Sequence, residues 1–320
     1  MSITVTGQVA TRESYGKALL ALGESRNDVV VLDADLSGST KTKAFSQQYP
    51  ERFFNMGVAE ANMIGTASGL ASTGLTVFAS SFAMFAVGKA FEQVRQEIAL
   101  PIANVKICAS HAGLTTGEDG ASHQVLEDLA IMRVLPNMRV IVPADGRETE
   151  AAIAAVAASE GPAYVRLSRM KTPVFLPDDY EFEFGKIPVL RDGSDITLAA
   201  CGVCVHPALE AAEMLATEGI QARVLNVACI KPLDEATLIA ASRDTGAIVT
   251  VEEHQRRGGM GSAVAEVIAE QAPCHVRRLG MDDRFGESGD GAELLAHFGL
   301  DAPSIAQAAR ETLALKQKGR

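Results

Sequence analysis

Short, wholly apolar runs alternate with longer amphipathic stretches along this sequence, and the alternation restricts the chain to an α/β architecture. Val29-Val-Val-Leu32 is apolar at every position, as a strand buried on both faces of a parallel sheet requires. The first part of the chain predicts helices at 14–22, 61–72, 84–98 and 147–158 and strands at 29–32, 75–79, 105–109, 140–142 and 164–167. This order predicts a doubly wound α/β layer.

Residues 171–185 interrupt the rhythm, because two prolines, an acidic cluster and a closing glycine occur together there. Beyond them, strands expected at 196–200, 222–227 and 247–251 alternate with helices expected at 208–218, 234–242 and 262–270. A length of 320 residues also suits two domains of about 150 residues each. We therefore expect two doubly wound α/β domains, residues 1–185 with a linker at about 171–185, and residues 186–320.

Charge and cysteine usage disfavour several classes of protein. The formal net charge of -11 leaves no obvious basic face for nucleic acid or an anionic membrane. No apolar run approaches the roughly 20 residues of a membrane span, and residues 1–8 lack a signal-peptide pattern, so we expect a cytoplasmic protein. The five cysteines are scattered and odd in number, which predicts reduced thiols. We interpret Cys201-Gly-Val-Cys204 as structural, because no second cysteine pair completes a metal site.

Glu60 opens a predicted helix that otherwise contains mainly small and apolar residues. A carboxyl group in such surroundings can share a proton with a basic ring nitrogen, which is a catalytic role. The segment alone favours the other interpretation, an ordinary acid at a helix N-terminus, stabilised by the helix dipole. Both interpretations stay open until its neighbours are considered.

The glycine-rich segment 110–123 directly follows the strand expected at 105–109. Loops at the carboxyl ends of parallel strands are where ligands bind in such folds. His111 and His123 can donate hydrogen bonds or transfer protons, and Asp119 can accept from hydroxyl groups. The alternative is a solvated connection with incidental histidines.

Two further segments follow strands of the same predicted sheet. Phe82 and Phe85 are three residues apart, so they share a helical face and could form a stacking wall for a planar ring, although alone they would suit core packing. Residues 33–40 add acids and hydroxyls to this edge, with Asp33 or Asp35 as alternative turn-forming residues.

Together these segments resemble the C-terminal half of a transketolase. The resemblance rests on Arg12, Asp33-Ala-Asp-Leu36, Gly57-Val-Ala-Glu60, Ser81-Phe82, Gly117-Glu-Asp-Gly-Ala-Ser-His123, Pro143-Ala-Asp145 and Leu167-Ser-Arg169. Their order and spacing agree over nearly the whole chain, and the Gly-Glu-Asp-Gly-x-x-His element is the most specific. The resemblance implies a pyrimidine-binding domain of thiamine diphosphate enzymes, followed by a transketolase C-terminal domain.

The resemblance also implies roles for the residues that face the cofactor. Glu60 corresponds to the acid that hydrogen-bonds the aminopyrimidine ring of thiamine diphosphate. Phe82 and Phe85 correspond to residues that stack against this ring, and Asp35 corresponds to a residue beside the cofactor. Gly88 stands where the family often has a third aromatic residue, so we expect a thinner ring wall.

A second group of residues corresponds to the family's substrate site. His111 and His123 match residues that contact substrate oxygens, and Asp119 matches the acid that recognises a substrate hydroxyl. The residues expected to cradle a sugar-phosphate tail are Arg12, Ser39, His111 and Arg169. Guanidinium groups suit this task because they pair with a dianion through two donors.

The implied activity is transfer of a two-carbon ketol unit from a ketose phosphate to an aldose phosphate, as in pentose phosphate metabolism. The family's metal-binding Gly-Asp-Gly element with a following Asn is not found, because Gly289-Asp-Gly291 lies in the C-terminal domain without that Asn. We therefore expect no metal ligands in this chain. A separate N-terminal diphosphate-binding transketolase subunit would hold the diphosphate and its Mg²⁺ or Ca²⁺, in a heterotetramer with two copies of each chain.

Three alternatives to this function stay open. A 2-oxoacid dehydrogenase beta subunit has a similar domain order, but its usual loop lacks the Gly-Glu-Asp-Gly-x-x-His element. A transketolase-like enzyme for branched or sulfonated sugars would use the same cradle. A non-catalytic regulatory subunit would be expected to lose Glu60 or the loop histidines, and all three are present.

Overall fold

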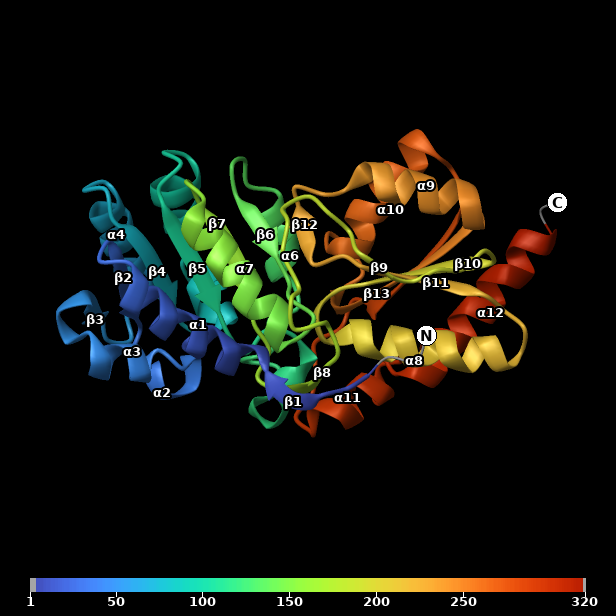
Figure 1. The fold of residues 1–320 in the computed structure, drawn as a ribbon, viewed down its shortest axis with the longest axis horizontal. Helices are drawn as coiled ribbons and strands as arrows, with labels where there is room; N and C mark the ends of the chain where they lie inside the picture. Colours follow the sequence, from blue (N-terminus) through green and yellow to red (C-terminus); the bar gives the residue numbers. More distant parts are fainter. Residues whose placement is uncertain (1–3, 319–320) are drawn as a thin grey trace.

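A seven-stranded sheet forms the centre of the N-terminal part in the computed structural model, which describes residues 4–318 (Figure 1). In order across the sheet, its strands are β12 (Cys229–Lys231), β6 (Arg139–Ile141), β7 (Ala163–Arg166), β5 (Val105–Ala109), β4 (Thr76–Ser80), β2 (Val29–Asp33) and β3 (Phe53–Asn55). All neighbouring strands run parallel except β12, which is antiparallel to β6. The predicted α/β layer is therefore confirmed.

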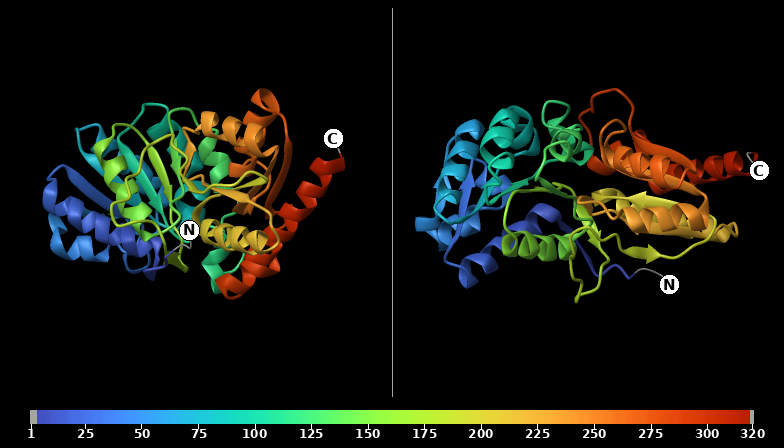
Figure 2. Two further views of the ribbon diagram at one scale, coloured as in Figure 1. Left: turned by 45° about the vertical axis from the view of Figure 1, so that its right-hand side comes forward. Right: turned by 90° about the horizontal axis from the view of Figure 1, so that it is seen from above.

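Helical segments cover both faces of this sheet, as Figure 2 shows. On one face lie α1 (Thr11–Ser25) and α7 (Gly146–Ala158); on the other lie α4 (Glu60–Ala71), η2 (Met84–Lys89), α5 (Phe91–Gln93), η3 (Val94–Ala99) and α6 (Asp128–Arg133). Side chains of a strand alternate between faces, so Val29 and Val31 pack with α1 and α7 while Val30 and Leu32 pack with α4. This arrangement explains why the β2 sequence is apolar throughout.

The C-terminal part contains a five-stranded sheet in the order β14 (His275–Met281), β13 (Ala247–Gln255), β10 (Ile196–Ala200), β11 (Ala222–Asn226) and β9 (Val189–Arg191). Only β9 is antiparallel to its neighbour. Its helices are α8 (Val205–Thr217), α9 (Glu235–Thr245), α10 (Met260–Gln271), α11 (Gly291–His297) and α12 (Ala302–Lys318). No helix within residues 4–318 is long and apolar enough to cross a membrane.

Several elements, most of them short, were not predicted. Among them are β1 (Gly7–Ala10) with its antiparallel partner β8 (Lys171–Val174), the strands β3, β9, β12 and β14, and the helices α2 (Ser37–Thr40), α3 (Lys43–Gln48), α6, α11 and α12. The segment predicted as helical at 84–98 is helical, but η2 and η3 are π-helical, with α5 between them. A π-helical turn contains extra backbone, and such turns are frequent at functional sites.

Strand β12 joins the two parts of the chain. It follows the predicted linker in sequence, yet it pairs with β6 of the N-terminal sheet, opposite Val140 and Ile141. The division into residues 1–185 and 186–320 stays a prediction, and the sheet topology crosses it.

Glu148 forms a second link between the two parts. Its carboxyl accepts from the backbone N–H of Ala144 at 2.7 Å, from Tyr180 Oη at 2.6 Å, and from Asn226 Nδ2 at 2.9 and 3.0 Å. Asn226 ends β11, so this one side chain ties α7 to the C-terminal sheet. Burial raises the pKa of Glu148 to about 7, because water no longer solvates the charged form.

We expect Glu148→Gln to flatten the pH dependence of stability. An acid with a raised folded-state pKa binds more protons folded than unfolded, so this group lowers stability as pH rises from about 4.5 to about 7. A shift of this size corresponds to roughly 3 kcal/mol. Urea unfolding at pH 5 and pH 7.5 measures the effect.

Glu150→Gln is the matched control for this experiment, because Glu150 lies on the same helix and pairs with Lys17 at the surface. The control should show the same change in unfolding free energy with pH as the unmodified chain. If Glu148→Gln also showed that change, the raised pKa assigned to Glu148 would be wrong.

Candidate functional site

The loops that carry the predicted site residues gather at one edge of the seven-stranded sheet. The parallel strands β2, β4, β5 and β7 end at Asp33, Ser80, Ala109 and Arg166. An isolated bridge between Phe82 and Ser110 extends the pairing beyond β4 and β5. The segments after these two strands are therefore held side by side.

Four aromatic rings form a cluster at this edge. Phe82 and Phe85 stack with ring centroids 6.1 Å apart and an interplanar angle of 17°. His111 stacks on Phe82 at 3.7 Å, and His123 meets Phe85 edge-on at 5.3 Å. Sequence reasoning placed these four residues near one another, and the structure brings them together: Phe82 lies in the segment after β4, Phe85 on η2, and both histidines in the 110–123 loop.

The surroundings of His111 fix its protonation state. Arg12 Nη1 lies 3.3 Å from His111 Nε2, and Ser110 Oγ lies 2.9 Å from Nδ1. Arginine only donates, so Nε2 accepts and the ring proton sits on Nδ1, facing the serine oxygen. Burial, followed by the charges of Arg12 and Arg169, lowers the pKa of His111 to about 3. The ring is therefore neutral at physiological pH.

Basic side chains converge beside His111, as expected for an anion-binding cradle. Arg12 Nη1 also donates to the backbone oxygen of Ser39 at 3.0 Å, so Ser39 contributes to the site through its backbone. Burial and the charge of Arg169 lower the pKa of Arg12. Lys41 acts electrostatically on His111 as well, although sequence reasoning did not select it. Like charges held this close favour a bound anion.

Arg169 has acidic partners within the predicted loop. Its Nη1 donates to Thr116 O at 2.5 Å and to Glu118 Oε2 at 2.8 Å, and Asp119 Oδ2 lies 3.8 Å away. The side chains of Glu118 and Asp119 are partly exposed. A bound anion would take the place of these carboxylates beside the Arg169 guanidinium group.

Glu60 begins α4 and is only 2% exposed. Lys89 Nζ donates to Glu60 Oε2 at 2.7 Å, and the lysine side chain is 55% exposed. Sequence reasoning missed Lys89, although a lone lysine in the apolar segment 82–90 was the available signal. The pair joins α4 to η2, which also carries Phe85 of the ring cluster.

The two aspartates after β2 have different roles. Asp33 is buried and accepts from the Leu36 N–H and from the hydroxyls of Thr40 and Thr42, so it is the turn-forming residue. Asp35 has a positive φ of 63° and accepts from Asn55 Nδ2 at 3.0 Å. Asp35 is therefore held at the edge of the sheet by Asn55 of β3.

Residues 4–318 contain no group of three or more His, Cys, Asp or Glu side chains that could hold a metal ion. Cys201 and Cys204 are buried and form no disulfide, and burial raises the pKa of both thiols. Cys201 packs in the core cluster shared with the N-terminal sheet, and Cys204 packs in the cluster of the C-terminal part.

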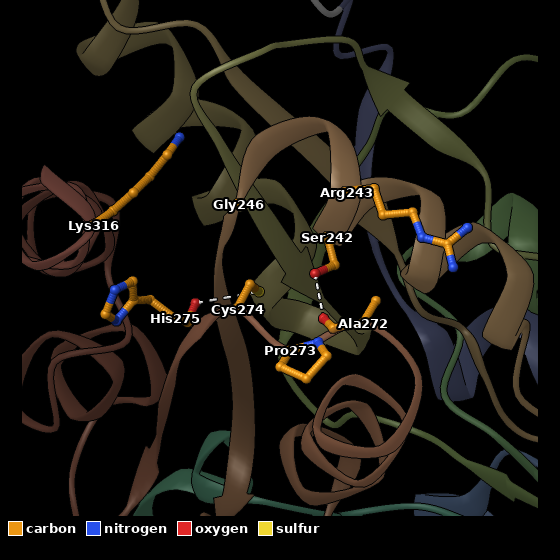
Figure 3. A pocket seen from close by; sticks show the side chains of 8 residues that line it. All are labelled: Ser242, Arg243, Gly246, Ala272, Pro273, Cys274, His275 and Lys316. Atoms are coloured by element: carbon orange, nitrogen blue, oxygen red, sulfur yellow. Dashed lines mark hydrogen bonds between the residues drawn. The ribbon is translucent and has the colours of Figure 1, made fainter. Parts of the chain in front are cut away.

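A surface pocket of about 640 Å³ lies in the C-terminal part (Figure 3). None of the predicted site residues lines it. It is lined by Ser242, Arg243, Gly246, Ala272, Pro273, Cys274, His275 and Lys316. Ser242 Oγ donates to Ala272 O, and Lys316 Nζ donates to the backbone oxygens of Asp195 and Thr245. Because these polar groups are engaged by the fold, we assign the pocket no function.

The fold and site define a two-part α/β protein that presents stacked rings and an anion cradle at the carboxyl ends of parallel strands. Residues 7–174 match the family model described as transketolase, pyrimidine binding domain, and residues 185–305 match the model described as transketolase, C-terminal domain. The chain belongs to the transketolase family.

Similar proteins cover the chain almost completely. A transketolase C-terminal section of Methanocaldococcus jannaschii is 51% identical over 94% of this chain and 96% of its own length. A 6-deoxy-6-sulfo-D-fructose transketolase subunit of Clostridium sp. strain MSTE9 is 43% identical over 94% and 93%. A solved structure titled split gene transketolase, inactive beta4 tetramer, is 52% identical, covers 96% of this chain and 99% of its own, and has a TM-score of 0.90.

We expect the His111 imidazole not to titrate between about pH 5 and pH 8, because its lowered pKa lies near 3. Histidine NMR spectra with ¹³C at Cε1 would show this, with the signal assigned by its loss in His111→Gln. In Arg12→Met the pKa of His111 should rise, since a positive charge and a donor to Nε2 are removed.

Lys17→Met is the matched control, because Lys17 lies on the same helix and pairs with Glu150 at the surface. It should leave the His111 signal unchanged. Titration of His111 near its ordinary value in the unmodified chain would contradict the assigned neutral state.

Proposed function

We propose that this chain is the C-terminal, pyrimidine-binding subunit of a split transketolase, transferring a two-carbon ketol unit between sugar phosphates. The observation that carries the proposal is the cluster of Phe82, Phe85, His111 and His123 beside the paired Arg12 and His111. A ring site and an anion site adjoin there, as a ring-bearing cofactor and a phosphorylated sugar require.

The chain's own residues suit the pyrimidine end of thiamine diphosphate, on which transketolases depend. Glu60 offers a buried carboxyl at a helix start, and the near-parallel Phe82 and Phe85 offer ring faces. When bound, this cofactor supplies the nucleophilic carbon that takes up the two-carbon unit. Glu60 would hold a proton shared with the ring nitrogen, and Asp35 would lie beside the cofactor.

The remaining site residues suit the sugar. The neutral His111 ring, together with His123, would hydrogen-bond substrate oxygens, and Asp119 would accept from a hydroxyl. Arg12 and Arg169, with Ser39 fixing Arg12, would bind the anionic tail. Because the tail would take the place of Glu118 on Arg169, binding should release that carboxylate.

A separate chain would complete the enzyme. We propose an N-terminal diphosphate-binding subunit that holds the diphosphate and its Mg²⁺ or Ca²⁺, with two copies of each chain. The relative named as a C-terminal section and the neighbour titled as a split gene transketolase support a partner, and the inactive state in that title supports the need for one. The cytoplasmic location stays a prediction.

A transketolase for modified sugars is the second candidate. The 43% identical relative named for 6-deoxy-6-sulfo-D-fructose favours it, because a sulfonate tail suits the same guanidinium cradle. A screen of phosphate and sulfonate sugars with the co-expressed pair of subunits distinguishes the two. No observation favours the 2-oxoacid dehydrogenase or regulatory alternatives.

We expect Glu60→Gln to lower ketol transfer by about 100-fold or more in the co-expressed pair, because an amide cannot hold the shared proton. A coupled assay of product aldose formation measures the loss. Glu97→Gln, which changes an exposed acid, should keep full activity. Equal activity of Glu60→Gln and the control would contradict a catalytic role for Glu60.

We expect Lys89→Met to strengthen thiamine diphosphate binding by about fivefold. Lys89 donates to the Glu60 carboxyl group, for which the ring nitrogen would compete, and an ion pair with one exposed partner is worth about 1 kcal/mol at most. Calorimetric titration of the co-expressed pair measures the affinity, with Lys17→Met as control. Unchanged or weaker binding would show that Lys89 does not compete with the cofactor.

A further inference from the structure

A buried carboxylate of the C-terminal part reaches into the 110–123 loop. Glu253 lies on β13 and is 4% exposed. Its Oε2 accepts from the Thr115 N–H at 2.9 Å, and its Oε1 accepts from the Thr115 hydroxyl at 3.2 Å. Thr115 belongs to η4 (Leu114–Asp119), so the turn that leads into the Gly-Glu-Asp-Gly element at 117–120 is fixed from the other sheet.

The loop leaves room for this carboxylate. Gly113 has a φ of +78°, and a Cβ at this position would overlap the carboxyl group of Glu253. Both the backbone conformation and the close approach therefore require glycine here. Nearby, a Cβ on Gly291 of α11 would lie 3.4 Å from Thr115 Cα, so the C-terminal part contacts the loop at a second point.

The segment that Glu253 anchors is hydrogen-bonded to the predicted site residues or is continuous with them. The Thr116 hydroxyl donates to the backbone oxygen of His111 at 2.8 Å, and Thr116 O accepts from Arg169. Asp119 ends η4, and the His123 N–H donates to Gly120 O at 3.0 Å. Moving Thr115 would therefore shift groups that contact the sugar under the proposed function.

Arg166 holds Glu253 in place. Its Nη1 lies 3.3 Å from Glu253 Oε1, and its Nε donates to Asp128 Oδ2 at 2.7 Å. Removing the Glu253 carboxylate leaves the guanidinium paired with Asp128, so the buried charge is still neutralised. The variants of Glu253 described below should therefore fold.

We propose that Glu253 is a positioning residue, through which the C-terminal part sets the geometry of the substrate-contacting loop. The importance of this positioning for catalysis rests on the proposed function, whereas the anchoring of the loop does not. The competing interpretation is that Glu253 only stabilises the C-terminal core.

Glu252 provides a matched control for that interpretation. It precedes Glu253 on β13 and is equally buried. Its carboxylate accepts from the N–H groups of Met260 at 2.7 Å and Gly261 at 2.8 Å, so it caps α10 and does not contact the loop. Loss of Glu252 should loosen α10, and loss of Glu253 should loosen the loop.

Hydrogen exchange of the free chain, followed by mass spectrometry, tests the anchoring. In Glu253→Ala the amides of residues 113–120 should exchange about tenfold faster or more, while α10 stays protected. Glu252→Ala should give the reverse pattern. Glu253→Gln keeps the side-chain volume and should loosen the loop less than Glu253→Ala does. Equal loop protection in the two alanine variants would overturn the anchoring, as would a uniform loss of protection in Glu253→Gln.

Kinetics of the co-expressed pair test the consequence. Glu253→Ala should lower kcat/KM for the sugar about tenfold more than Glu252→Ala, with thiamine diphosphate affinity unchanged. Equal losses in both variants would overturn the positioning role. An unmodified pair without ketol transfer would instead refute the proposed function, and the exchange pattern would still decide the anchoring.

Discussion

One buried guanidinium group connects the parts on which the site depends. Arg166 ends β7 of the N-terminal sheet, and its charge is met by Asp128 of α6 and by Glu253 of β13. Burial opposes the charge, but the two carboxylates outweigh it and raise the pKa of Arg166. Removing both carboxylates would be strongly destabilising, because the guanidinium would then remain in the interior without a partner. The sheet edge, the loop and the C-terminal part are thereby fixed relative to one another.

The sequence predicted the central strands of both sheets and the helices α1, α4, α7, α8, α9 and α10, because their apolar periodicity is strong, whereas β14 and α12 were missed despite their length. It did not predict β1, β3, β8, β9 and β12, which are three or four residues long and carry too little pattern. The π-helical form of Met84–Lys89 was also missed, because apolar spacing does not distinguish an α-helix from a wider turn.

For the site, strand ends were sufficient to group Phe82, Phe85, His111 and His123. Lys89 and Glu253 were not predictable in the same way. The contact of Lys89 with Glu60 depends on the winding of η2, and the contact of Glu253 with Thr115 joins residues 138 positions apart. Neither spacing is encoded in a local motif, so only the folded arrangement identifies them.

The strand exchange at β12 limits how this protein can move. β12 is hydrogen-bonded to β6 while its chain neighbours belong to the C-terminal sheet, and Glu148 and Glu253 form hydrogen bonds across the two parts. A hinge motion between the parts would have to break these buried contacts, and buried groups that lose their partners are costly. The two parts of this chain would then move as one rigid body. Access to a site at this sheet edge would have to be controlled by loops or by the interface with another chain.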